Sequence, residues 1–91
     1  MQNESLLPLL KLNLQLTSDA YDSLLLFELD CAANMITREG ITLTDAPDDA
    51  LLVVMYAAYL FQMRNSNDPM PRMLRYALNN RVMAEKGNPD A

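Results

Sequence analysis

The chain has 91 residues, which suits one domain, and 51% of them are hydrophobic. A net charge of −5 argues against a general nucleic-acid binder, and the lack of histidine excludes Ser–His or Cys–His nucleophile pairs and histidine metal sites. The single cysteine, Cys31, cannot form an internal disulfide, so the chain needs no oxidising compartment. No basic group precedes the first leucines, so we expect no signal peptide.

Two helices are predicted in the first 40 residues. Ser5 is expected to cap a short first helix, which ends near Asn13 and is followed by a link that packs on the core. Ser18 is expected to cap the second helix, because acidic residues follow it near the positive end of the helix dipole. Gly40 stands where a left-handed residue commonly ends a helix.

The third predicted helix is the most apolar part of the chain. Residues 50–64 read ALLVVMYAAYLFQMR, and their apolar side chains cover nearly the whole circumference of a helical wheel. This pattern predicts a helix enclosed by its neighbours, and the run is shorter than the roughly 20 residues of a membrane span. Asp45 or Ala46 should cap this helix, with Pro47 in its first turn.

A proline turn separates the third predicted helix from the fourth. The last helix is expected to start around Pro69 or Pro71 and to stop at Gly87 and Pro89, which leaves a frayed tail from about residue 87. We therefore predict that residues 1–91 form a single all-α domain. It should be a small bundle of about four helices around a central apolar helix at residues ~47–65.

Charge is distributed unevenly along the chain. Residues 1–63 contain two basic and nine acidic residues, whereas residues 64–86 contain five basic and two acidic residues. An acidic front and a basic back suit head-to-tail association between copies, and ion pairs within one chain are the alternative.

Several side chains do not fit a simple buried pattern. Leu26 and Phe27 flank the polar side of the second helix, so either a neighbouring segment covers them or they contact another subunit. Glu28 lies within the apolar side, where it must extend to solvent or pair with an arginine. The residues that we expect at an interface are Leu26, Phe27, Glu28, Met70, Arg72, Met73, Arg75 and Arg81.

Signatures of catalysis and of ligand binding are absent from the sequence. Asp45, Asp48 and Asp49 lack the spacing of a calcium loop, and the helix dipole already explains acidic residues at a helix start. Two glycines in the whole chain do not make a phosphate-binding loop. Cys31 lies on an apolar helix face and is interpreted as a core residue. We expect no enzyme, no cofactor and no metal.

The order of motifs resembles a known family. LKLNL precedes SDAYDSLL and FELDCAANMI; then come DAPDDALLVVMYAAYLFQMR and NDPMPRMLRYALNNR. The aromatic residue before Arg64, the turn with Pro69 and Pro71, and the leucines and arginine of the last helix are the most telling features. Over residues 5–83 this order resembles the head–tail connector (adaptor) family of tailed phages, also described as head-completion or DNA-packaging proteins.

The resemblance implies a structural protein that performs no reaction. Such a protein forms a homo-oligomeric ring beneath the portal vertex, extends the DNA channel and offers a platform for the next tail-side protein. Its partners would be copies of itself, the portal protein and a downstream tail-completion protein. DNA would only pass through the channel, and no membrane would be involved. It would be assembled in the bacterial host cytoplasm and reside in the virion at the head–tail junction.

Two alternatives follow from the same residues. The first is a small helical, dimeric regulator or protein-interaction module that uses the same apolar surface. The second is a helix-turn-helix DNA binder, although the few basic residues of the last helix would give only weak phosphate-driven binding.

Overall fold

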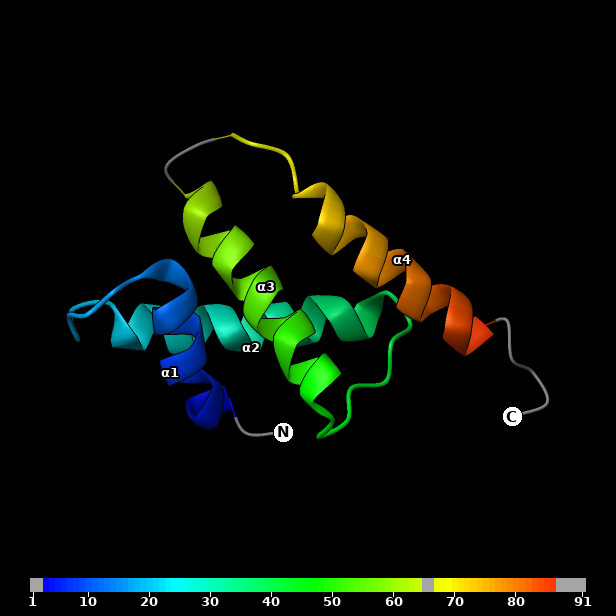
Figure 1. Cartoon of the computed structure of the whole chain (residues 1–91), viewed down its shortest axis with the longest axis horizontal. Helices are drawn as coiled ribbons and strands as arrows, with labels where there is room; N and C mark the ends of the chain where they lie inside the picture. The colour runs from blue at the N-terminus through cyan, green and yellow to red at the C-terminus, as the bar shows by residue number, and fades with distance from the viewer. Residues whose placement is uncertain (1–2, 65–66, 87–91) are drawn as a thin grey trace.

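The computed structural model describes residues 3–64 and 67–86, which contain four helices (Figure 1). The helices are α1 (Asn3–Leu14), α2 (Asp22–Arg38), α3 (Pro47–Met63) and α4 (Arg72–Lys86). No strand occurs in these two stretches, so the all-α prediction is confirmed. The predicted helix stop at Gly87 and Pro89 and the tail from about 87 lie outside the described residues.

The third helix, α3, is the centre of the fold. It packs against α1, α2 and α4, and Figure 1 shows it crossing α2 with α1 and α4 on its two sides. The core is built from fully buried side chains of all four helices, among them Leu10, Leu25, Leu29, Ile36, Val53, Leu74 and Leu78. The expected enclosure of α3 is nevertheless wrong at Leu51, which is exposed.

The starts of the first two helices differ from the sequence prediction. Helix α1 begins at Asn3, so Ser5 lies inside it and is not its cap. Helix α2 begins only at Asp22 and has no side-chain cap. The hydroxyl of Ser18 instead accepts a hydrogen bond from the Ala20 N–H group at 3.0 Å within the link. A local turn therefore uses the serine that the sequence assigned to the helix.

Ion pairs hold this link in place. The Lys11 ammonium, in the last turn of α1, lies 2.8 Å from Asp19 and 2.9 Å from Asp22. The hydrogen bond from Lys11 lowers the pKa of the exposed Asp19 carboxyl. One lysine thus connects the end of α1 with the start of α2.

The end of α2 and the starts of α3 and α4 follow local sequence rules. Gly40 has a left-handed φ of 98°, as predicted, and its N–H group donates to the Thr37 carbonyl at 3.0 Å. Ala46 is the N-cap residue of α3, with Pro47 in its first turn, and α4 begins directly after Pro71. The predicted end of α3 near residue 65 is two residues late, because α3 ends at Met63.

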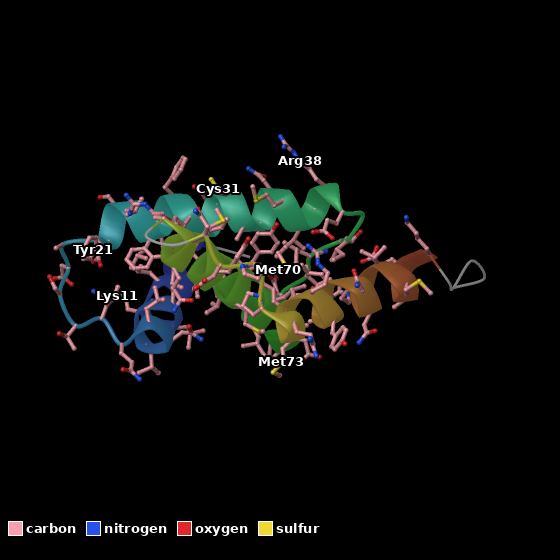
Figure 2. The ribbon with its side chains drawn as sticks, turned by 90° about the horizontal axis from the view of Figure 1, so that it is seen from above. Lys11, Tyr21, Cys31, Arg38, Met70 and Met73 are labelled. Carbon is pink, nitrogen blue, oxygen red and sulfur yellow. The ribbon has the colours of Figure 1, made fainter. Side chains whose placement is uncertain are left out.

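Helices α2 and α4 lie on opposite sides of the molecule (Figure 2). Figure 2 shows α2, with Cys31 and Arg38, along one side and α4, with Met73, on the other. Neither of these two helices, nor any other helix of the described chain, is long and apolar enough to cross a membrane.

Candidate interaction surfaces and a buried ion pair

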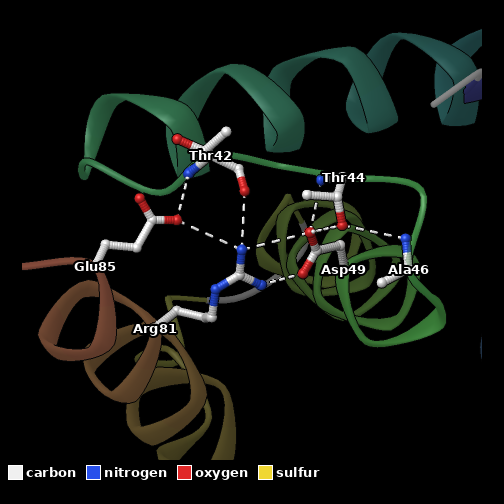
Figure 3. Close-up of polar contacts among 6 residues, drawn as sticks. All are labelled: Thr42, Thr44, Ala46, Asp49, Arg81 and Glu85. Carbon is white, nitrogen blue, oxygen red and sulfur yellow. Dashed lines mark hydrogen bonds and ion pairs between the residues drawn. The ribbon is translucent and has the colours of Figure 1, made fainter. Parts of the chain in front are cut away.

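A buried aspartate at the start of α3 binds an arginine of α4. Asp49 is 2% exposed in its side chain, and its carboxylate accepts hydrogen bonds from Arg81 (Figure 3). It also accepts from the Thr44 N–H group at 2.6 Å and the Thr44 hydroxyl at 2.8 Å. Burial alone would raise the pKa of Asp49, but these hydrogen bonds outweigh it and hold the pKa below its ordinary value.

Arg81 also ties α4 to the segment between α2 and α3. Its guanidinium donates to the Thr42 carbonyl at 2.8 Å and lies 3.5 Å from Glu85, one turn further along α4. Glu85 in turn accepts from the Thr42 N–H group at 2.7 Å. Because donors and acceptors of this cluster bind one another, we interpret it as a clasp that fixes α4 on α3. Sequence reasoning missed this role of Asp49.

The arginines of the last helix have different surroundings. Arg75 forms an ion pair of 3.4 Å with Glu39 at the end of α2, and Arg81 is held by Asp49. Two of the three arginines in the candidate set therefore pair within the chain. Arg72 is exposed at the start of α4 and forms no ion pair with a residue of the described stretches. It is the arginine best placed to meet another molecule.

Glu28 lies buried on α2 beside a shallow hollow. The residue is 5% exposed, and its Oε2 atom finds no hydrogen-bond partner within residues 3–64 and 67–86. Burial raises the pKa of Glu28, and the positive charge of Arg64 opposes this rise only in part. The side chain therefore does not extend to solvent. The hollow has a volume of about 300 Å³ and is lined by Leu24, Phe27, Glu28, Cys31, Met35, Leu60 and Arg64.

The apolar candidates divide into covered and exposed residues. Leu26 and Met70 are half-buried and pack against the core. Phe27 remains 64% exposed on α2, and Met73 is exposed on α4. Cys31 is only partly buried, so the expected core position is not fully reached. The α2 surface around Phe27 and the hollow beside Glu28 are called the α2 face below.

A second apolar surface was not anticipated from the sequence. A groove between α1 and α3 has a volume of about 330 Å³ and is lined by Leu9, Leu12, Asn13, Pro47, Ala50, Leu51 and Val54. Leu9 and Leu12 are exposed although they belong to a leucine-rich helix. The number of leucines in the first helix could have indicated this surface, because it exceeds the number that one side of a short helix can bury.

No group of three or more histidine, cysteine, aspartate or glutamate side chains within the described residues could hold a metal ion. The strongest polar cluster, around Asp49, is occupied by its own hydrogen bonds.

Comparisons with protein-family models, with curated proteins and with solved structures found no match to this chain. The exposed surfaces of the fold and the order of motifs in the sequence are therefore the grounds for a function.

Proposed function

We propose that the chain is a structural protein that forms a ring at the portal vertex of a tailed phage, where it joins the DNA-filled head to the tail. One observation carries the proposal: the domain leaves unlike apolar surfaces uncovered on different helices. These are the α2 face around Phe27, the groove between α1 and α3, and the exposed side of α4 with Met73.

Unlike surfaces favour head-to-tail association. A two-fold dimer buries the same patch on both subunits, whereas a ring joins one patch to a different patch on the next copy. A domain of this size with several separate apolar surfaces is suited to contacts with more than one neighbour. In the proposed ring, neighbouring copies, the portal protein and a tail-completion protein would cover these surfaces.

The charge of the chain fits passage of DNA better than its retention. Acidic residues exceed basic ones by five, and two of the arginines of α4 are engaged by Glu39 and Asp49. A channel wall with surplus negative charge repels the phosphates and keeps DNA mobile. We therefore expect that the chain does not change the electrophoretic mobility of random duplex DNA at low salt.

The direct test is electron microscopy of the purified chain mixed with a phage portal protein. We expect closed rings stacked on one end of the portal. The variant to compare with the unaltered chain is Phe27→Glu, which changes an exposed side chain of the α2 face. It should keep the helical circular dichroism of the unaltered chain and should weaken contacts with the portal or tail protein. A stable two-fold dimer that ignores the portal would replace the proposal with an interaction module, and binding of random DNA would favour a DNA-binding function.

A further inference from the structure

Helix α4 has an exposed apolar face in addition to its buried one. Leu74 and Leu78 are buried against the core, as the attachment of α4 to α3 requires. On the outside, Met73, Tyr76 and Met83 are 76%, 58% and 69% exposed. Together with Asn80 they follow the 3-4-3 spacing of side chains on one helix face. We call Met73, Tyr76, Asn80 and Met83 the outer α4 face.

This spacing is that of a helix that binds in a groove. Helices recognised in this mode present anchors at positions i, i+3 and i+7 or beyond to an apolar channel. Two methionines are suited to such contacts, because their flexible side chains adapt to an uneven surface. The outer α4 face therefore fits a concave apolar partner.

The groove between α1 and α3 is an apolar hollow of about 330 Å³. Its lining is apolar apart from Asn13, and Leu51 connects it with a second hollow of about 290 Å³ on the α4 side of α3. The two hollows therefore adjoin along α3 and share Leu51 in their lining. We call the two hollows together the α3 groove.

Charge and connectivity indicate a second copy as the occupant. Arg72, exposed and without an ion pair among the described residues, adjoins Met73 of the outer α4 face, whereas Asp48 lines the hollow beside Leu51. The outer α4 face cannot enter the groove of its own chain, because the opposite side of α4 is packed on α3 and held by the Asp49–Arg81 ion pair.

We propose that the outer α4 face of one copy docks in the α3 groove of the next copy. This inference rests on the proposed ring and specifies which surfaces form its subunit contact. Each copy then offers one groove and one helix face, so the contact is head-to-tail and repeats until the assembly closes. The α2 face takes no part in this contact and stays free for a portal or tail protein.

The test uses two variants of the full chain, each altered on one surface. One variant disables the outer α4 face and carries both Met73→Glu and Tyr76→Glu. The other disables the α3 groove and carries both Leu12→Glu and Leu51→Glu. All four side chains are exposed, so circular dichroism should show intact helices in both variants. Phe27→Glu is the control, because it places the same charge on an exposed apolar site of the α2 face.

Sedimentation velocity of each protein alone, and of the two disabled variants mixed, gives the decisive measurement. We expect each variant to lose self-association by about tenfold or more, while the control assembles like the unaltered chain. The mixture should form a 1:1 dimer, because one intact α4 face then meets one intact groove. Unchanged assembly of either variant, or a mixture that stays monomeric, would overturn the inference.

The outcomes also separate this inference from the proposed function. Rings on the portal that persist in both disabled variants would leave the proposed function standing and reject this contact. A different outcome is a head-to-tail assembly that both variants abolish but that does not bind a portal protein. It would support this contact and reject the proposed function. An unaltered chain that stays monomeric both alone and with the portal would reject both.

Discussion

Removal of the Arg81 side chain tests whether the clasp fixes α4. In Arg81→Met, the buried Asp49 carboxylate loses the hydrogen bonds from the guanidinium but keeps those from the Thr44 N–H group and hydroxyl. The Thr42 carbonyl loses its donor as well. Methionine preserves most of the aliphatic packing, so the change reports mainly on the polar contacts.

The expected cost follows from the burial of Asp49. Breaking a buried ion pair by removing one partner costs about 3–5 kcal/mol, and the two remaining Thr44 hydrogen bonds reduce this to about 2–4 kcal/mol. A domain of 91 residues typically has a free energy of unfolding of about 5–14 kcal/mol, so the loss is a large part of it. Arg75→Met, which breaks the more exposed pair with Glu39, should cost about 0–1 kcal/mol.

Urea unfolding followed by circular dichroism measures both variants. The folded pKa of Asp49 is below its unfolded value, so its contribution is present above the unfolded pKa and is lost as pH falls through the folded pKa. The deficit of Arg81→Met should therefore shrink below about pH 4. A loss under about 1 kcal/mol at pH 7, or equal losses for Arg81→Met and Arg75→Met, would refute the proposed clasp.

Two further predictions concern burial. Burial raises the pKa of Glu28 in the folded chain, so ionisation of this carboxyl lowers the free energy of unfolding as pH rises through that pKa. The substitution Glu28→Gln removes this cost, so it should raise the free energy of unfolding at pH 7 and give no gain near pH 4. Equal urea midpoints at pH 7 would contradict this. On α4, Leu78→Ala should cost about 2–4 kcal/mol, whereas Met83→Ala should change monomer stability by less than about 0.5 kcal/mol. Similar losses in dilute solution would place Met83 in the core.

Local sequence rules were enough to predict the four helices and several of their ends. Helix formation and helix stops depend on neighbouring residues, so periodicity identified α3, and turn chemistry identified Gly40 and placed the start of α4 around Pro69 or Pro71. Even here, Ser18 was assigned to the wrong structure, because a serine hydroxyl can serve a local turn as well as a helix end.

Which helix faces are covered depends on how the helices pack against one another. Position on a helix is local information, but burial depends on how α1 and α4 lie against α3. Packing left Leu51 and Met73 exposed, enclosed Glu28 and brought Asp49 to Arg81, 32 residues away. The pattern of charges in the sequence suggested Arg81 as an interface residue, because such a pattern does not show which charged side chains lie close together. In the folded chain Arg81 instead pairs with Asp49.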